Sequence, residues 1–259
     1  MSKGQTIKEI TLSLSGGAAR GAYHLGVLAK FDELGIKIKA LSGASIGAFV
    51  AVAYASGLKP KEILEIIKTS DFKKAFKLNF PFNKSFFKID VASKTIQNLV
   101  KFSDLKELNT PVYISAVDLV SGEVVYLNEG EILKLVLGSC AITPVFEAVK
   151  YNDYLLADGC FKDNLPITPL KKYGLDIWAV DLQPFVGSGK GGIIRTTKQA
   201  LKIALTPSRA EICKNAIYLT NPNLNKFSLF SFKEFDALFE LGYIDAEIKI
   251  KEKYDTNSI

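Results

Sequence analysis

The sequence predicts a three-layer α/β/α fold built around a central, mainly parallel β-sheet. Two strand–turn–helix units follow one another near the N-terminus, and a further buried strand is expected much later, at Ile177–Asp181. Successive units of this kind usually place their strands side by side and in parallel. The chain has 259 residues, 48% hydrophobic and 23% charged, and shows no linker. We therefore expect one domain over residues 1–259, although the length also allows two small ones.

The first unit begins at Glu9–Ser15, where polar and apolar residues alternate up to a pair of glycines. This pattern predicts a strand that ends in a tight turn. Helical spacing of apolar residues follows from Arg20 to Leu34. The second unit repeats the order, with a strand at Ile36–Leu41, a turn at Ser45 and a small-residue helix over Ile46–Ser56.

The remainder of the chain supplies further elements, with neither an internal repeat nor low complexity. Periodicity and capping residues predict helices over residues 60–68, 90–102, 132–137, 193–205 and 235–250. Alternation and turn residues predict strands over residues 112–117, 123–127, 177–181 and 216–220, and hairpin turns at 121–122 and 152–153.

Composition limits the classes of partner and cofactor. The net charge is +6, but the basic residues are spread along the chain, which favours a negatively charged membrane surface over nucleic acid. Cys140, Cys160 and Cys213 form no CxxC pair and there is one histidine, so we expect neither a disulfide framework nor a metal site. We expect no cofactor, and composition says nothing of the oligomeric state.

The apolar runs are too short to span a bilayer, and the polar segment Met1–Glu9 lacks the apolar region of a signal peptide. We therefore expect a cytoplasmic protein in a reducing compartment, with contact to a membrane surface at most peripheral.

The segment Gly43-Ala44-Ser45-Ile46-Gly47 matches the GxSxG pattern of hydrolytic serine enzymes. Small residues at Gly43 and Gly47 make room for a sharp strand-to-helix turn that would expose Ser45 as a nucleophile at a helix N-terminus. On its own the pattern also fits an ordinary turn, or a serine that caps the helix.

The earlier glycine-rich turn supplies context for this serine. Its uncovered backbone N–H groups would lie at the carboxyl end of a neighbouring strand, where they could form an oxyanion hole. The residues concerned are Gly16, Gly17, Ala18, Arg20 and Gly21. A phosphate cradle is the competing interpretation, although the spacing lacks GxGxxG and no Lys-Ser or Lys-Thr follows. Arg20 has two interpretations, as an orienter of this loop or as the partner of a core carboxylate.

The catalytic base is the open question, because His24 lies inside a predicted helix, where a structural role is the more common one. Asp158 ends an apolar run and precedes Gly159, which places a carboxylate at a strand end, although such a pair also makes ordinary turns. Asp118 and Asp181 also lie at strand ends, and we interpret them as turn or capping residues.

Four segments in this order resemble the patatin-like phospholipase family. They are the glycine loop with Gly16, Gly17, Arg20 and Gly21; the elbow with Gly43, Ser45 and Gly47; the stretch Ser139–Phe146 with Pro144; and Asp158-Gly159 followed by Asn164 and Pro166. The resemblance covers roughly residues 10–182. It departs from the family pattern at Cys160, where the family often has a second glycine.

The resemblance implies a patatin-like fold and a Ser/Asp dyad. Ser45 would attack an ester carbonyl, Asp158 would take its proton, and backbone groups near Gly17 and Ala18 would hold the oxyanion. Water would then release the acyl group. The implied activity is that of a lipid acyl hydrolase of the phospholipase A or lysophospholipase type, acting on phospholipid or another lipid ester without a metal.

Three other hypotheses stay open at this point. They are a phosphate-, nucleotide- or lipid-binding module that uses the glycine loop without chemistry, a lipid-surface regulatory protein with a vestigial site, and an acyltransferase.

The segment Asp71–Ile89 carries six phenylalanines among lysines and asparagines. It could be a lid or membrane-contacting flap, with the aromatic rings in the lipid boundary and the lysines at anionic headgroups. It could equally pack its aromatic rings over the sheet and turn its lysines to water.

Overall fold

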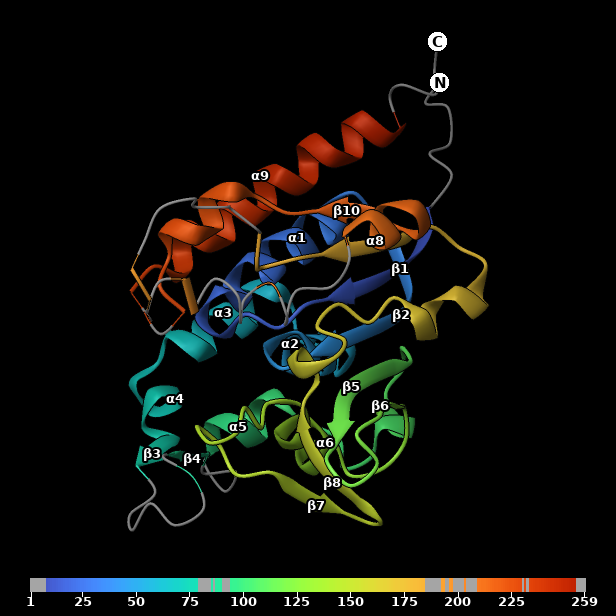
Figure 1. The fold of residues 1–259 in the computed structure, drawn as a ribbon. Coiled ribbons are helices and arrows are strands. Elements are labelled where there is room, and N and C mark those ends of the chain that lie inside the picture. The colour runs from blue at the N-terminus through green and yellow to red at the C-terminus, as the bar shows by residue number, and fades with distance from the viewer. Residues whose placement is uncertain are drawn as a thin grey trace, which may run out of the picture.

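The computed structural model describes residues 8–78, 85, 87–89, 94–184, 192, 193, 196, 197, 203, 209–229, 231 and 233–254. Its centre is an eight-stranded sheet with the order β10-β9-β1-β2-β5-β8-β7, in which β6 also pairs with β5 (Figure 1). The strands are β1 (Glu9–Leu14), β2 (Lys37–Ala44), β5 (Val112–Asp118), β6 (Val124–Leu127), β7 (Val149–Tyr151), β8 (Tyr154–Asp158), β9 (Ile177–Val180) and β10 (Ile217–Leu219).

The sheet is mainly parallel, as the sequence predicts. Strands β10, β9, β1, β2 and β5 all run in one direction. Strand β6 is antiparallel to β5 and β7 is antiparallel to β8, because a tight turn connects each of these two pairs as a hairpin. Strand β8 is also antiparallel to β5, although β6, α6 and β7 separate the two along the chain.

The helices are α1 (Ala22–Glu33), α2 (Ile46–Ala55), α3 (Pro60–Lys68), α4 (Ser70–Lys74), α5 (Lys94–Leu99), α6 (Ile132–Ser139), α8 (Arg209–Asn215) and α9 (Phe235–Tyr254). Short 3₁₀ helices include η1 (Ala18–Gly21), η3 (Gly159–Phe161) and η4 (Thr168–Tyr173). In the described part of the chain, none of the helices combines the length and apolarity needed to cross a bilayer.

Two hydrophobic clusters form the layers on either side of the sheet. The larger one joins apolar residues of β1 and β2 to α1, α2, α3 and α9. The smaller one contains Leu165, Leu170 and Ile212, and it packs the chain after β8, including η4 and α8, against the opposite face. Alternate residues of a strand face opposite sides, so β1 sends Leu12 and Leu14 into the larger cluster.

Helices α1 and α9 pack closely because each presents a glycine at their crossing. A Cβ on Gly26 would overlap the carbonyl oxygen of Phe239, and one on Gly242 would overlap that of Tyr23. The bare backbones therefore approach each other directly, which two larger residues would prevent.

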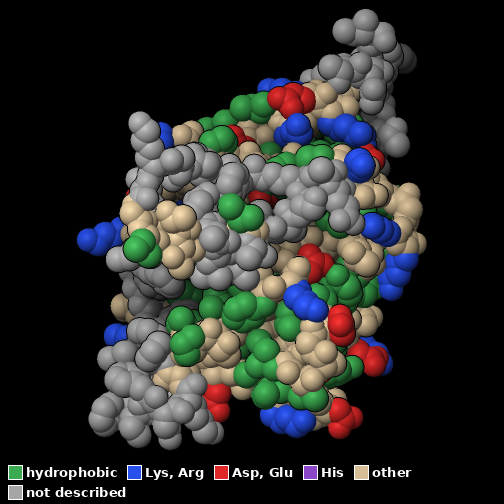
Figure 2. All heavy atoms as spheres, viewed as in Figure 1, with side chains coloured by type: hydrophobic (Ala, Val, Ile, Leu, Met, Phe, Trp, Pro, Cys, Tyr) green, Lys and Arg blue, Asp and Glu red, His purple; other side chains and the backbone are tan. Residues whose placement is uncertain are grey.

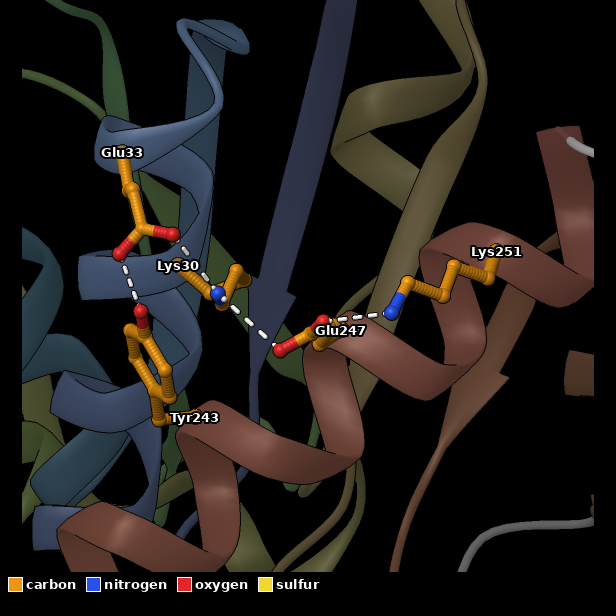
Figure 3. A network of polar contacts seen from close by, with 5 residues as sticks. All are labelled: Lys30, Glu33, Tyr243, Glu247 and Lys251. Atoms are coloured by element: carbon orange, nitrogen blue, oxygen red, sulfur yellow. Dashed lines mark hydrogen bonds and ion pairs between the residues drawn. The ribbon is translucent and has the colours of Figure 1, made fainter.

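A polar network joins the same two helices beyond this crossing (Figure 3). The Lys30 ammonium is buried between Glu33 of α1, at 2.8 Å, and Glu247 of α9, at 3.2 Å. It also lies 3.9 Å from the ring centre of Tyr243, whose hydroxyl donates to Glu33. A lysine rarely lies buried without such partners, so this network fixes α9 onto α1.

The segment Asp71–Ile89 is described only in part. Its first phenylalanine, Phe72, is buried and contacts the ring of Phe49 in α2, with ring centres 6.1 Å apart, as the packing interpretation expects. Strands β3 (Phe76–Leu78) and β4 (Phe87–Ile89) pair antiparallel. Residues 79–84 and 86 lie outside the described residues, so the flap stays a prediction.

One predicted helix differs from expectation, and another falls largely outside the described residues. The one expected over residues 90–102 is shorter, at Lys94–Leu99, and residues 90–93 lie outside the described part. Most of the one expected over residues 193–205 also lies outside it.

Candidate active site

Ser45 occupies the turn between β2 and α2 in a backbone conformation that residues with a side chain rarely adopt. Its φ is 53° and its ψ is −124°. Although Ser45 is the N-cap residue of α2, its side chain makes no capping hydrogen bond. The interpretation of Ser45 as an ordinary capping serine is therefore wrong, and capping does not prevent its hydroxyl from acting as a nucleophile.

The glycines of the GxSxG pattern are required by close approach of backbone segments. A Cβ on Gly47 would overlap the carbonyl group of Leu14 at the end of β1, and one on Gly43 would lie 2.5 Å from the amide nitrogen of Ala48. The elbow therefore packs in close backbone contact with its own helix and with the neighbouring strand.

Two buried serines stabilise the elbow through a chain of hydrogen bonds. The amide of Ser45 donates to Oγ of Ser139 at 2.9 Å, and that hydroxyl donates to the carbonyl oxygen of Ser115 at 2.6 Å. Ser139 entered the sequence analysis only as the start of a family-like segment. Nothing in its neighbours along the chain shows that its hydroxyl reaches Ser45, because the contact joins residues far apart in the sequence.

The pairing of β5 explains how Ser45 and Asp158 come together. Strand β6 pairs with β5 residues 114–117, which overlap both the residues paired with β2 and those paired with β8. A strand has two edges, so β2 and β8 must share the edge opposite β6. They run along it toward each other, and Ala44 and Asp158 end opposite the consecutive residues Ser115 and Ala116.

Asp158 is fully buried, with 0% of its surface exposed. Its Oδ1 accepts from the amide of Cys160 at 2.8 Å, whereas its Oδ2 has no hydrogen-bond partner among the residues that the structure describes. Burial raises the pKa of Asp158 to about 6, against the opposing effect of the Cys160 amide and of the nearby Ser45 hydroxyl, which favour the charged form. This raised pKa is typical of a carboxylate that exchanges a proton near neutral pH.

Two cysteines lie beside this carboxylate. Burial is the main cause that raises the pKa of both Cys140 and Cys160, and the charge of Asp158 raises it further. Both thiols therefore stay protonated at neutral pH, so neither offers a thiolate to compete with Ser45.

His24 lies fully buried in α1. Its Nε2 is 2.9 Å from the carbonyl oxygen of Ser15, which can only accept, so Nε2 carries the proton of this hydrogen bond. Burial lowers the pKa of His24 to about 4, which keeps the ring neutral. These contacts support a structural role, in which the ring fixes the start of the glycine loop.

The amides of the glycine loop fall into two groups. Those of Gly16 and Arg20 donate to the protein itself, to Asn164 and to the carbonyl oxygen of Gly17 respectively. Across the described residues, no acceptor is found for the amides of Gly17 and Ala18. Gly21 contacts the elbow instead, since a Cβ there would overlap the side chain of Ile46.

The Arg20 guanidinium stabilises this loop by hydrogen bonds to later parts of the chain. It donates to the carbonyl oxygens of Leu182, at 3.1 Å, and Phe227, at 2.8 and 3.1 Å. Burial lowers the pKa of Arg20, and the charge of nearby Asp181 opposes that change. The loop-orienting interpretation of Arg20 matches these contacts, whereas its donors do not point to an oxyanion.

Asp118 and Asp181 are turn residues, one of the two roles predicted for them. Asp118 accepts from the amides of Val120, Ser121 and Leu155, which together with the Ser121 hydroxyl hold its pKa well below the ordinary value. Asp181 accepts from the amide of Gln183 and the hydroxyl of Tyr218. Within the described ranges, no group of three His, Cys, Asp or Glu residues is arranged to hold a metal ion.

The fold and the elbow together define a class: α/β proteins with a serine on a strand–turn–helix elbow at the carboxyl ends of parallel strands. Within that class, the sequence profile of the patatin-like phospholipase family matches residues 12–171. This chain belongs to the patatin-like phospholipase family. The resemblance of the four sequence segments is thereby confirmed, and the family's activity is the hydrolysis of lipid esters.

Full-length relatives match at low identity. Lysophospholipase NTE1 of Candida albicans is 22% identical over 284 residues, which cover 95% of this chain and 20% of that protein. Patatin-like phospholipase domain-containing protein 6 of Mus musculus is 22% identical over 270 residues, covering 90% and 20%. The chain thus spans about a fifth of the length of these relatives.

Among solved structures, VipD from Legionella pneumophila shares the fold, with a TM-score of 0.53 and 14% sequence identity. The match covers 96% of this chain and 67% of that one. At this identity the likeness concerns the fold alone.

Proposed function

We propose that this protein is a lipid acyl hydrolase of the lysophospholipase or phospholipase A type, which acts through a Ser45–Asp158 dyad and a covalent acyl-enzyme. One observation carries the proposal: a serine on a strained elbow, with its hydroxyl unused as a cap, lies beside a buried carboxylate, one oxygen of which finds no hydrogen-bond partner in the described part of the chain. In an ordinary turn, we would expect the serine hydroxyl to cap the helix and the buried carboxylate oxygen to accept a hydrogen bond.

In the first half of the reaction, Oγ of Ser45 attacks the ester carbonyl carbon while its proton passes to Oδ2 of Asp158. The amides of Gly17 and Ala18 stabilise the negative charge on the former carbonyl oxygen. The bond to the alcohol then breaks, and the leaving oxygen takes the proton from Asp158.

In the second half, water attacks the acyl carbon of the ester on Ser45 and gives a proton to Asp158. The bond from the acyl carbon to Oγ breaks, and the proton returns to Oγ. The product is a free fatty acid, and both residues regain their starting state.

The lipid class of the substrate is supported by two observations. The relative from Candida albicans carries the name lysophospholipase, and the one from Mus musculus the name patatin-like phospholipase domain-containing protein 6. Hydrophobic side chains also gather on the face over α6 and β8, the elements that carry Ser139 and Asp158 (Figure 2). Ile142, three residues beyond Ser139 at the end of α6, leaves 37% of its surface exposed. Exposed apolar side chains next to a site suit an acyl chain or a lipid surface.

The test is product identification by mass spectrometry after incubation with vesicles that contain diacyl phospholipid and lysophospholipid. The wild-type protein is expected to release free fatty acid, and Ser45→Ala is expected to release none. Adding an alcohol acceptor distinguishes hydrolysis from acyl transfer. Vesicle binding without any product from the wild type would contradict the proposal and favour a lipid-binding module.

A further inference from the structure

We infer that Asn164 and Gln183 are positioning residues that aim the oxyanion-stabilising amide of Gly17 by clamping the Gly16–Gly17 peptide group. The inference rests on the proposed function, and it concerns two side chains from different parts of the chain. Neither touches the reacting atoms.

Asn164 binds both polar groups of Gly16. Its Oδ1 accepts from the Gly16 amide at 3.1 Å, and its Nδ2 donates to the Gly16 carbonyl oxygen at 3.5 Å. The side chain is buried, so its amide has no water to bond with instead. A Cβ on Gly16 would lie 2.5 Å from Oδ1 of Asn164, so a glycine is needed at this position to make room for the asparagine.

The Gly16 carbonyl oxygen accepts from further donors. Nε2 of Gln183 lies 3.4 Å from it, and Oγ of Ser15 lies 3.2 Å from it. The Ser15 hydroxyl is itself fixed, because it accepts from the amide of Leu182 at 2.8 Å. These contacts together determine the direction in which the carbonyl points.

A trans peptide group transmits this direction to the next amide. The carbonyl of Gly16 and the N–H of Gly17 belong to one plane and point in opposite directions. Donors that hold the carbonyl oxygen therefore also aim the N–H of Gly17 away from themselves.

The loop lies against the nucleophile at this point. A Cβ on Gly16 would be 3.1 Å from Cβ of Ser45. The Gly17 amide finds no acceptor in the part of the chain that the structure describes. A donor that is fixed in advance and left without a protein acceptor is what an oxyanion hole requires.

The clamp draws on chain beyond the family-profile match. Residues 12–171 include Asn164, whereas Gln183 and Leu182 follow β9 outside that range. The carboxyl end of β9 lies beside that of β1, since Leu14 pairs with Val180. This pairing brings Gln183 to the glycine loop. The family motifs alone do not identify the contact between Gln183 and that loop.

Three variants test the inference. Gln183→Met removes one donor from a half-buried position, and Asn164→Ala removes both of the asparagine's contacts. Asn225→Ala is the matched control, because this amide donates to a backbone carbonyl of the same segment, that of Pro184 at 3.0 Å, and not to Gly16. The kcat for a short soluble ester is measured per active site titrated with a fluorophosphonate, which removes misfolded protein from the count.

We expect kcat per titrated site to fall about 10-fold in Gln183→Met and about 100-fold in Asn164→Ala, because loss of an oxyanion donor lowers kcat by 10²–10³. KM should stay within about twofold, since the change acts on the transition state. The double variant should lose less than the product of the single effects, because both side chains hold one peptide. Asn225→Ala should match the wild type.

A second readout separates positioning from general loosening. A trifluoromethyl ketone forms an oxyanion on Ser45, whereas an ether analogue of the same chain does not. The affinity for the ketone should fall in parallel with kcat, and that for the ether should not change.

Equal loss of affinity for both ligands, or wild-type kcat per titrated site in Gln183→Met and Asn164→Ala, would overturn the inference alone. A wild-type protein that neither turns over the ester nor takes the phosphonate would overturn the proposed function and the inference with it.

Discussion

At the scale of single residues, Ser45 holds an unfavourable backbone conformation at the point where chemistry is expected. A residue with a side chain in such a sparsely populated region costs about 1–3 kcal/mol, which the surrounding structure must offset. Here the Gly47 contact with Leu14 and the Ser139 hydroxyl impose the turn.

This strain gives a first prediction. Ser45→Gly removes the Cβ that opposes a φ of 53°, whereas Ser45→Ala keeps it. The glycine variant should therefore be more stable than the alanine variant by about 1 kcal/mol, which raises Tm by about 2–4 °C in a chain of this size. Thermal unfolding followed by circular dichroism measures the difference. An alanine variant as stable as the glycine variant would show that the turn is not strained.

Asp158 gives a second prediction, on pH. A carboxylate can accept the Ser45 proton only when it is ionised, and the pKa of Asp158 is raised to about 6. The kcat/KM should therefore rise with pH through an inflection near 6 and level off above about pH 7. His24, with its pKa lowered to about 4, does not titrate in that window. A kcat/KM that is constant from pH 5 to 8 would contradict the assignment of Asp158 as the base.

His24 supports a third prediction. A glutamine at this position can donate an amide N–H to the carbonyl oxygen of Ser15, as Nε2 of the histidine does. His24→Gln should therefore keep most of the wild-type kcat/KM. A loss beyond about 100-fold with an unchanged circular dichroism spectrum would assign His24 a catalytic role, because a general base contributes at least about that much.

At the scale of elements, α1 and α9 cross with their backbones in direct approach at Gly26 and Gly242. Gly26→Ala would place a methyl group against the carbonyl oxygen of Phe239 and force the two helices apart. We expect destabilisation by about 1–3 kcal/mol, measured as a lower Tm. Gly192→Ala is the control, because a Cβ there meets none of the described atoms within 4 Å. An equal Tm for both variants would show that the crossing tolerates extra volume.

The elements themselves were largely predictable because their causes are local. Pro60 and Lys68 bound α3 in the sequence and in the structure alike, and the hairpin turn before Tyr154 follows from its Asn-Asp pair. The edge that β2 and β8 share on β5 was not predictable, since strand pairing depends on contacts between distant parts of the chain.

The candidate site divides in the same way. Ser45 and Asp158 could be selected from their glycine neighbours and from the family resemblance. Ser139 at the end of α6 and Gln183 in a loop could not be assigned, because a polar side chain does not reveal which distant backbone group it will bind.

At the scale of the whole molecule, both ends of the chain contribute to one site. The N-terminal strand β1 leads into the glycine loop, and the carbonyl oxygens of Leu182, Phe227 and Leu229 accept from Arg20 and Ala19 of that loop. Helix α9 then packs on α1, which continues from the loop. These contacts tie the C-terminal part of the described chain to the glycine loop, and one domain over residues 1–259 stays a prediction.

The central claim is that Ser45 is the nucleophile and Asp158 its base. The most direct test is mass spectrometry of the intact protein after exposure to a fluorophosphonate, followed by peptide mapping, for the wild type, Ser45→Ala and Asp158→Asn. We expect one adduct on Ser45 of the wild type, none on Ser45→Ala, and labelling of Asp158→Asn that is slower by at least about 100-fold. An adduct that persists in Ser45→Ala, or labelling of Asp158→Asn at the wild-type rate, would contradict the dyad.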